Sequence, residues 1–568
     1  MKELLVNVFY DINFNSLKLN NKTTEILDIS GNFIHDFKKL DISDLPDYND
    51  IYKVSLQEFV TVAANLSVKK LGKKTVRNFL FFGFPIYWLT DISLKHPHLH
   101  FLLNLIIFKN TVIKHPELFR KFDKITVLAH KNTTFTAHFL KNLPINFFYH
   151  PICTKKGKRK FKILKSVLRN SLNVLRQKKI KENNTVSDYL IIYPNNMTNY
   201  SKTFFTQISE IVKTADKKLF SLPYFPFMKS NNFGNLNVSI KLSIFDVFKI
   251  TARILTLKFS VFFFALFSNK PETFFLKAEL NNVFESKLHL FFMYFGLKKF
   301  SKKIKHPLKV FYEDEFYETG RVISKAFSEN NFITTFGIQH AAFLPEHTVY
   351  TITDTEITGL KKDNGLPIPD KFIVWGNYFK NIFLKNNSLD ERYVIPAGNL
   401  TYIYNSKMPA ENNKTNRILY CLTTENIFKK EIPIIQNLSE ITKDYTPVFR
   451  FHPLWKFDTE IIKQSLGIRT VNISQEKNIK DDIIKSDIII TSAHSSVFLD
   501  AVVYKKPVLR LITKSDSLPN NLFGIYNCKT NFDFSTCFQK INSCYIPENK
   551  NFGLLNLNNN TWNSLFRK

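Results

Sequence analysis

Two short stretches in the second half of the sequence carry residue types that could bind a phosphate. In the first, Arg450 ends an apolar run and His452 follows it, immediately before Pro453. In the second, the apolar run 488–490 leads into a hydroxyl-rich turn before a helix-like segment; the hydroxyl residues of this turn are Thr491, Ser492, Ser495 and Ser496. Backbone N–H groups and hydroxyls at a helix start suit anions, and ligands of open α/β sheets lie beyond the carboxyl ends of strands. The two stretches therefore predict a site for the monophosphate or diphosphate of a nucleotide donor.

Three members of this predicted donor site, Ser495, Ser496 and Asp500, also have an ordinary structural explanation. Ser495 and Ser496 suit the N-cap of the following helix, which is a very common position for serine. Asp500 comes one helical turn after Ser496, where its carboxylate would reach either a ribose hydroxyl or solvent. Arg450 and His452 would lie on the same face of a strand, so both charges would point toward one phosphate. The occurrence of both stretches in this order, His452 first and the Ser495-Ser496 turn after it, favours phosphate binding.

A third stretch offers carboxylates that could deprotonate an acceptor hydroxyl. An apolar, strand-like run leads into the acidic segment 313–318. Glu313 is the leading candidate for the general base and Glu318 is the second. The acids that rank behind them are Asp314 and Glu315. Neighbouring carboxylates raise one another's pKa, which would bring a base close to neutrality. The alternative is an acidic turn that caps the helix after it, because acids are common at helix N-termini.

A glutamine–histidine pair, Gln339 and His340, ends the next strand-like run, residues 333–338. We expect His340 to contact the acceptor or to position the general base. Gln339 and Tyr317 are expected to line the acceptor side. The alternative for His340 is a packed polar residue at a strand end. The predicted catalytic residues are Glu313, Glu318 and His340.

Nothing in the sequence predicts a metal or a cofactor. No Asp-x-Asp element flanked by apolar strands is present, and the five cysteines contain no Cys-x-x-Cys pair. Helix dipoles and basic side chains can stabilise a leaving phosphate in place of a metal. The expectation is therefore a metal-independent transfer without a cofactor, in a reducing cytoplasm without disulfides.

The combination of His452-Pro453 with Ser495-Ser496 resembles the HP and SS motifs of bacterial sialyltransferases. Related patterns occur in Kdo transferases of capsule synthesis and in CDP-glycerol transferases. The resemblance implies an α/β, GT-B-like fold with two Rossmann-like domains facing across a cleft. It also implies an inverting glycosyltransferase that uses a nucleotide-activated sugar, with a CMP-linked acidic sugar favoured. The alternative is transfer of a polyol phosphate from CDP-glycerol, which the sequence does not separate from sugar transfer.

Residues 310–400 and 448–510 together resemble a group of surface-carbohydrate (O-antigen) biosynthesis proteins, in which an acidic segment precedes a Gln-His element. This implies a role in O-antigen, lipooligosaccharide or capsule synthesis, with a lipid-linked or glycan acceptor. Three residues depart from these patterns. Asp500 replaces a glutamate, Lys505 stands where a glycine is usual, and Ala341 replaces a glycine after the Gln-His pair. A lysine at that helix end requires a less favourable backbone conformation or a different turn.

The length of the chain and its alternating strand-like and helical stretches predict two α/β domains. An acceptor-side domain is expected over 1–405, with a helical, basic insertion at about 150–305, and a donor-binding domain over 406–568. The segment 405–416 is the expected linker, and the tail 551–568 is expected to cross back onto the first domain. Strands expected early in the chain are Leu4–Phe9, Phe79–Ile86 and Lys124–Leu128.

The chain has 79 basic and 48 acidic residues, which gives a net charge of +31. This charge implies an anionic partner. We expect an anionic membrane surface, with the enzyme peripheral to the inner face of the cytoplasmic membrane. The basic stretch 153–182 suits anionic lipid, or is instead a solvated face over a core-facing stripe. The apolar stretch 254–267 is too short to span a membrane and is expected to be buried, with a helix in the membrane interface as the alternative.

Two other classes of function compete with the transferase. The charge would suit a nucleic-acid-binding protein, but no motif of such proteins is present and nucleic acid is not the expected partner. A non-catalytic assembly protein on the same scaffold is the second, and in it Glu313 and His452 would be dispensable.

The N-terminal residues predict a first strand rather than a signal peptide.

Overall fold

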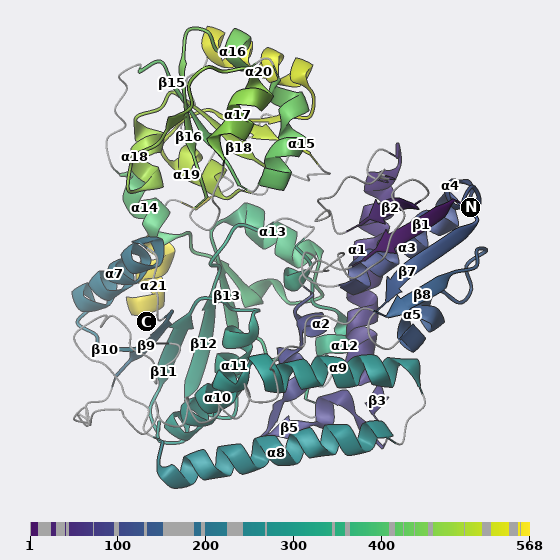
Figure 1. Ribbon diagram of the computed structural model, residues 1–568. Coiled ribbons are helices and arrows are strands. Elements are labelled where there is room, and N and C mark those ends of the chain that lie inside the picture. Colours follow the sequence, from purple (N-terminus) through teal and green to yellow (C-terminus); the bar gives the residue numbers. More distant parts are fainter. Residues whose placement is uncertain are drawn as a thin grey trace. The chain divides into compact units, whose positions relative to one another are not determined.

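The computed structural model divides the chain into two compact units (Figure 1). The first unit comprises Met1–Ile373 and Lys380–Ile395, and the second comprises Val374–Phe379 and Pro396–Lys568. The structure describes residues 2–8, 24–29, 40, 42, 45–71, 73–95, 101–129, 133–151, 187–194, 199–223, 242–266, 270–343, 347–357, 364–407, 415–423, 425–436, 438–452, 458–493, 495–513, 524–544, 555–556 and 558–567.

The first unit contains a four-stranded sheet in the order β2-β1-β7-β8, in which neighbouring strands are parallel. Its strands are β1 (Glu3–Asn7), β2 (Thr24–Asp28), β7 (Lys124–Ala129) and β8 (Phe148–Pro151). The helices between and beside them include α1 (Tyr48–Val68), α3 (Phe101–Lys114) and α5 (Thr133–Leu140). The strands expected near residues 4–9 and 124–128 are confirmed.

A six-stranded sheet in the order β10-β9-β11-β12-β13-β14 forms the second layer of strands in the first unit. Its strands are β9 (Tyr189–Tyr193), β10 (Leu219–Pro223), β11 (Leu308–Tyr312), β12 (Ile333–Ile338), β13 (Lys371–Val374) and β14 (Val394–Pro396). All five residues of β9 are buried, as expected for a strand that is covered on both faces. The helices of this part are α7 (Asn199–Thr214), α8 (Ile244–Leu266), α9 (Pro271–Ser286), α10 (Leu288–Ser301) and α11 (Glu318–Phe327).

Two sequence expectations about the first unit differ from the structure. The segment predicted as a helical insertion supplies β9 and β10 to the six-stranded sheet, and its described helical part is α7–α10. A short continuous apolar run fits a buried strand and a buried helix equally well by periodicity, which explains this difference. Residues 79–86 are not one strand but a hairpin of β5 (Leu80–Phe81) and β6 (Phe84–Pro85). Phe82 and Gly83 both have positive φ, as a two-residue hairpin turn requires.

The second unit is built on another six-stranded parallel sheet, in the order β17-β16-β15-β18-β19-β20. Its strands are β15 (Arg417–Cys421), β16 (Thr446–Arg450), β17 (Asn472–Ile473), β18 (Ile488–Ser492), β19 (Val508–Leu511) and β20 (Ile525–Cys528). Its helices include α14 (Leu400–Ser406), α15 (Glu425–Ile435), α16 (Leu438–Ile441), α17 (Thr459–Leu466), α18 (Ile479–Ile484), α19 (Val497–Val503), α20 (Asn531–Cys544) and α21 (Asn560–Arg567). Numbered along the chain, the order is 3-2-1-4-5-6, that of dinucleotide-binding α/β folds.

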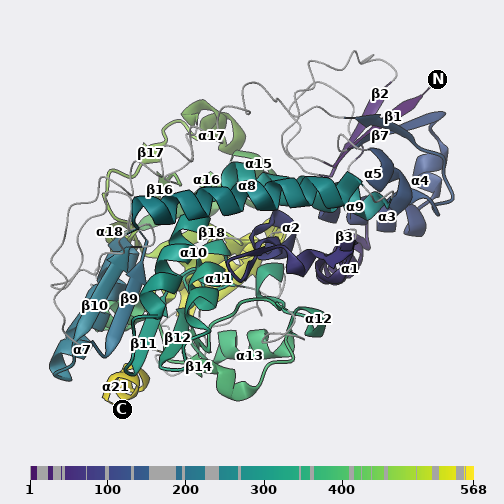
Figure 2. The ribbon, with the colours of Figure 1, turned by 90° about the horizontal axis from the view of Figure 1, so that it is seen from below.

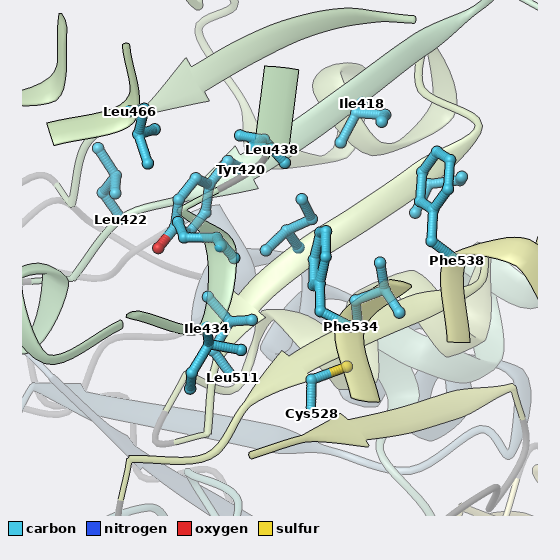
Figure 3. Packing of buried hydrophobic residues seen from close by; sticks show 14 of the residues in the cluster. Ile418, Tyr420, Leu422, Ile434, Leu438, Leu466, Leu511, Cys528, Phe534 and Phe538 are labelled. Atoms are coloured by element: carbon cyan, nitrogen blue, oxygen red, sulfur yellow. The ribbon is translucent and has the colours of Figure 1, made fainter. Parts of the chain in front are cut away.

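The core of the second unit joins this sheet to the helices on one of its faces (Figure 3). Tyr420 and Leu511 project from strands and pack among Leu438, Phe534 and Phe538 from helices. Each of these side chains is almost fully buried. Burial of this apolar surface fixes α15, α16 and α20 against the strands, and so fixes where the strands end.

The α/β class and the parallel sheets predicted from the sequence are confirmed by these pairings. Two Rossmann-like domains would have one sheet each, whereas the structure has a further four-stranded sheet, which contains the strands expected near residues 4–9 and 124–128. The basic stretch 153–182 and residues 408–414 of the expected linker lie outside the described residues. No helix among the described residues is both long and apolar enough to cross a membrane.

The last described residues of the second unit fold back onto its first segment. Asn556 N donates a 2.7 Å hydrogen bond to Trp375 O, and the buried Trp562 donates through Nε1 to Gly398 O at 3.1 Å. Gly398 has φ of +85°, and a Cβ there would overlap the backbone oxygen of Asn556. Both the conformation and the close approach therefore require glycine at this position.

We expect Gly398→Ala to destabilise the second unit by about 2–4 kcal/mol, because strain adds to displacement of residues 556–567. Thermal unfolding and limited proteolysis of the tail measure this. The matched control is Gly467→Ala, since Gly467 also has positive φ but no atom within 4 Å of the added Cβ. The control should cost only about 1 kcal/mol of backbone strain. Equal effects of the two substitutions would contradict the packing role of Gly398.

Candidate active site

The strand order of the first unit's six-stranded sheet creates a place for a ligand. β9 and β11 are neighbours, but the chain leaves β9 toward β10 on one side and β11 toward β12 on the other. Ligands of open α/β sheets bind beyond the carboxyl ends of strands at such a reversal. Glu313 follows β11 directly, and Ser201 lies in α7, the helix after β9. The two meet there, because Ser201 Oγ donates a 3.1 Å hydrogen bond to Glu313 Oε2.

Glu313 is a buried carboxyl whose proton affinity is strongly changed by its surroundings. Its side chain is 5% exposed. Burial, together with the nearby charges of Asp314 and Glu315, raises the pKa of Glu313 to about 7 although His340 and Ser201 act in the opposite direction. A carboxyl with this pKa is half ionised near neutral pH, which is the condition for an efficient general base.

The turn that carries the three acids is held in an uncommon backbone conformation. Asp314 has φ of 59°, in the left-handed region, which aspartate tolerates better than most residues. A Cβ on Gly320 would overlap the backbone oxygen of Asp314, so α11 packs directly against this turn. A Cβ on Gly337 would lie only 2.6 Å from Glu315 Cβ, so glycine in β12 makes room for the Glu315 side chain. Two glycines therefore allow the acidic turn to be buried.

His340 lies between two of these carboxylates. Its Nδ1 is 3.2 Å from Glu315 Oε2 and its Nε2 is 3.7 Å from Asp314 Oδ1. Burial lowers the pKa of His340, but the carboxylates, Glu315 first, more than offset this and raise the pKa to about 9. The imidazole is therefore an imidazolium at neutral pH, and its ring packs edge-on against Tyr317 with centroids 5.2 Å apart.

The other residues predicted for this side occupy different surroundings. Gln339 is buried and donates through Nε2 to Ala341 O at 3.0 Å, which fixes the turn that carries His340. Burial and the neighbouring acids raise the pKa of Tyr317, so its hydroxyl stays protonated. Glu318 begins α11 and forms a 2.9 Å ion pair with Lys287. Glu313 rather than Glu318 is thus joined to the acid–histidine cluster, and the role of each stays a prediction.

The sheet of the second unit reverses direction in the same way, between β15 and β18. Thr491 and Ser492 end β18 and are both buried at this position. Behind them, Glu431 accepts a 2.7 Å hydrogen bond from Tyr420 Oη. Burial raises the pKa of Glu431 to about 7, although hydrogen bonding acts against this. Thr491 and Ser492 therefore stand at the carboxyl end of a strand beside the reversal of strand order, and their contact with a donor stays a prediction.

Arg450 ends β16, but its guanidinium has partners other than solvent. Its Nη1 donates to the fully buried Asp482, whose second oxygen accepts from Arg417 Nη2. Ser474 Oγ also donates to Asp482, at 2.6 Å. This network, here called the Asp482 clamp, ties β15, β16 and α18 together. Arg450 consequently has a structural role, and its predicted contact with the donor phosphate stays a prediction.

His452 follows the clamp and is exposed at the carboxyl end of β16. Ser495 Oγ accepts from Val497 N at 3.4 Å, whereas the exposed Ser496 is the N-cap of α19 and its side chain makes no capping bond. The turn before them is anchored by the buried Arg510, which donates through Nη2 to Ala493 O at 2.6 Å. Nothing in the sequence motif pointed to Arg510, because it stands in the next strand.

Asp500 lies one turn into α19, and burial raises its pKa to about 7. No described residue makes a hydrogen bond or an ion pair with its carboxyl group. Lys505, where the sequence departs from the related motifs, has φ of 58°. The expected unfavourable backbone conformation is therefore present at that helix end.

The comparisons with known proteins find similar structures but no family. No protein-family model and no curated protein matches the chain. A UDP-GlcNAc 2-epimerase from Neisseria meningitidis, bound to UDP-GlcNAc, is 12% identical over 64% of this chain and 96% of its own, with a TM-score of 0.37. The wall teichoic acid polymerase TagF is 12% identical over 68% of this chain and 90% of its own, with a TM-score of 0.33. A glycosyltransferase of kitacinnamycin is 10% identical over 63% and 92%, with a TM-score of 0.36. At these scores the matches assign no activity and no residue role to this chain.

The site contains residues that the sequence reasoning missed. Ser201, Glu431, Asp482 and Arg510 belong to no motif. Ser201 contacts the predicted Glu313 and Asp482 contacts the predicted Arg450, whereas Glu431 binds Tyr420 and Arg510 binds Ala493 O in the turn before Ser495. Among the described residues, no group of three or more His, Cys, Asp or Glu side chains is placed to hold a metal ion.

Proposed function

We propose that this protein is a GT-B-like glycosyltransferase of surface-polysaccharide synthesis. It would transfer a sugar from a nucleotide donor, with inversion, to a lipid-linked or glycan acceptor. The observation that carries the proposal is Glu313, a buried carboxyl with a pKa near 7 at the ligand-binding edge of a parallel sheet. In the alternative, a solvated acidic turn, Glu313 would be exposed and its pKa would not be raised by burial.

In the proposed reaction, the Glu313 carboxylate takes the proton of the acceptor hydroxyl. The hydroxyl oxygen forms a bond to the anomeric carbon, and the bond from that carbon to the donor phosphate breaks. The electron pair of the broken bond leaves with the nucleotide phosphate. Attack from the face opposite the leaving group inverts the anomeric centre, and a base of pKa near 7 suits this step.

His340 would stay protonated throughout and carry a fixed positive charge beside the base. Its Nδ1 proton is directed at Glu315, and among the described residues the partner of Nε2 is Asp314, at the longer distance of 3.7 Å. That N–H would bind an acceptor oxygen, because the carboxyl groups of Glu313, Asp314 and Glu315 already balance the positive charge of His340.

On the second unit, the donor phosphate would bind His452 and the Ser495–Ser496 turn, with Asp500 toward the ribose. The turn is held by Arg510, and the strand before His452 is held by the Asp482 clamp. His452 follows β16, Ser495 and Ser496 precede α19, and Asp500 lies in α19, so secondary-structure elements would hold these groups in place for binding.

We expect one nucleotide among CMP, CDP, UDP and GDP, or its sugar, to raise the melting temperature of the protein, because a ligand that binds only the folded state stabilises it. A dissociation constant one hundredth of the nucleotide concentration corresponds to about 2.7 kcal/mol of stabilisation. The shift should be lost in His452→Ala and kept in His138→Ala, a control at an exposed histidine on α5.

Stabilisation by CMP-linked acidic sugars supports the sugar transferase. Stabilisation by CDP-glycerol, followed by release of CMP with glycerol phosphate transferred, supports the polyol-phosphate alternative. A cooperative melting transition that no nucleotide shifts would contradict both and favour a non-catalytic role.

A further inference from the structure

Helix α8 carries two apolar faces, and the described residues of the first unit cover one of them. The covered face packs mainly against α9, with further contacts to α10 and β5, through Ile250, Ile254, Leu257 and Val261. The other face is exposed: Phe245, Phe248, Leu255, Phe259, Phe262 and Phe263 are each between 45% and 69% exposed. A surface helix normally has a single apolar stripe. The second stripe therefore needs a partner that the described residues do not supply.

The exposed side chains form one continuous stripe rather than scattered positions. They recur at intervals of three, four and seven residues along the 23 residues of α8, so they share a side of the helix. Phe259 and Phe263 stack with ring centroids 6.4 Å apart. Figure 2 shows α8 as one long, continuous helix. A helix of this length extends about 35 Å at 1.5 Å per residue. Apolar patches of this extent mark binding surfaces.

Lysines flank the stripe along its length. Lys249 lies 4.4 Å from the Phe245 ring centroid, and Lys277 of α9 lies 4.6 Å from that of Phe262. At the far end, the hairpin of β3 (Lys70–Leu71) and β4 (Lys74–Thr75) contacts α8, and Lys74 lies 5.6 Å from the Phe264 ring. The exposed lysines of this hairpin are Lys69, Lys70, Lys73 and Lys74.

Of the acids in this region, Glu285 of α9 lines a pocket together with Leu255, Phe259 and Phe262, and Lys258 lines the same pocket. Asp246, the acid within α8, is 8% exposed and forms a 2.6 Å ion pair with Lys299. The hairpin from 69 to 75 contains no acid. The exposed face of α8 is therefore apolar in its centre, and its edges carry several lysines and one acid, Glu285.

We propose that the exposed face of α8, together with the β3–β4 hairpin, docks on an anionic lipid bilayer. The helix would lie in the plane of the interface, with its phenylalanines among the acyl chains and the lysines at the phosphate groups. Charge decides between this partner and a second copy of the chain. Two copies would bring the same lysine clusters together, in a protein of net charge +31, whereas anionic headgroups neutralise them.

This docking surface is separate from the proposed catalytic residues and does not depend on the proposed function. Vesicle binding requires no donor, no acceptor and no turnover. A failure to bind lipid would therefore leave the transferase proposal unaffected, and a failure of catalysis would leave lipid binding unaffected.

Co-sedimentation of the full chain with vesicles tests the proposal. We expect binding to vesicles of phosphatidylcholine with phosphatidylglycerol, and binding at least tenfold weaker to phosphatidylcholine alone or in high salt. The variant Phe248→Ser/Phe259→Ser/Phe263→Ser should bind anionic vesicles at least about thirtyfold less tightly. Lys73→Glu/Lys74→Glu should reduce binding at least about tenfold. These side chains are exposed, so the variants should melt as the wild type does.

The matched controls lie in the second unit. Phe532→Ser changes another strongly exposed phenylalanine, 78% exposed, and Lys407→Glu/Lys443→Glu reverses two other exposed lysines. Both should bind vesicles nearly as the wild type does. Equal binding by the wild type and the triple phenylalanine variant would overturn the proposal. So would a wild-type dimer, insensitive to vesicles, that the triple variant converts to a monomer.

Depth of insertion provides a second measurement. Phe259→Trp should be quenched by lipids with brominated acyl chains, whereas Phe532→Trp should not be. Absence of extra quenching at position 259, in protein bound to the vesicles, would place the helix outside the bilayer and overturn the proposal.

Discussion

Glu313→Gln should abolish transfer and at the same time stabilise the protein at alkaline pH. Removing a general base typically lowers the rate by about 10²–10⁴-fold. Glutamine keeps an oxygen that can accept from Ser201 Oγ, so the geometry should survive. The thermal-shift experiment identifies a donor. The rate at which nucleotide is released from that donor in the presence of acceptor measures the loss of transfer.

The stability effect follows from the sign of the pKa shift. The pKa of Glu313 is about 7 in the folded protein, above its ordinary value of 4.5, because burial disfavours the charged form. The folded state therefore keeps the proton up to a higher pH than the unfolded state does. The free energy of unfolding consequently decreases as the pH rises from about 4.5 to 7. One pKa unit corresponds to about 1.4 kcal/mol, so the uncharged glutamine should gain up to about 3 kcal/mol at pH 8 and nothing at pH 4.

Loss of the Glu313 charge also removes one of the carboxylates that stabilise the His340 imidazolium, which reduces this gain. Glu318→Gln is the matched control, because Glu318 is half-buried in an ion pair with Lys287. It should keep most of the activity and show no pH-dependent gain. A Glu313→Gln variant with wild-type turnover would contradict the assignment of the base.

Asp482→Asn should destabilise the second unit by about 3–5 kcal/mol, the usual cost of breaking a buried ion pair by removal of one partner. Asp482 is completely buried and binds both Arg417 and Arg450, which would keep their charges without a counter-charge. Denaturant unfolding, with hydrogen exchange of β15 and β16 to assign the transition to the second unit, measures the loss.

The neighbouring Asp481 provides the control for this prediction. It lies in the same first turn of α18 but is half-buried, with a 3.4 Å hydrogen bond from Asn478. Asp481→Asn should cost under about 1 kcal/mol, the usual effect of one acid at a helix N-terminus. Similar losses for the two substitutions would show that the Asp482 clamp is not what holds the strands.

The sequence predicted those parts of the fold and site whose evidence is local. The runs that became β11, β12, β16 and β18 are short and apolar, and a polar residue directly after such a run must lie at a strand end. Because parallel strands end on one edge, Glu313 and His340 were expected to be near each other, and their side chains do share one cluster.

The contacts that tune these residues could not be predicted, because they join distant parts of the chain. Ser201 and Glu313 are 112 residues apart, and no motif links them. Arg450 was expected to face a phosphate because the sequence shows its positive charge. The sequence does not show that the buried Asp482 forms an ion pair with this guanidinium. An apolar helix such as α8 likewise does not reveal from its sequence which of its two faces the protein covers.

The hydrogen bond between Trp562 and Gly398 has a consequence for the time course of synthesis, since the two residues are 164 positions apart. At translation rates of about 5–20 residues per second, roughly 10–30 s pass between them. During that interval the residues around Trp375 and Gly398 have been synthesised, but the residues that contact them, Asn556 and Trp562, have not. Nascent chains would present this surface to chaperones and to one another, so slower elongation should increase aggregation of the second unit.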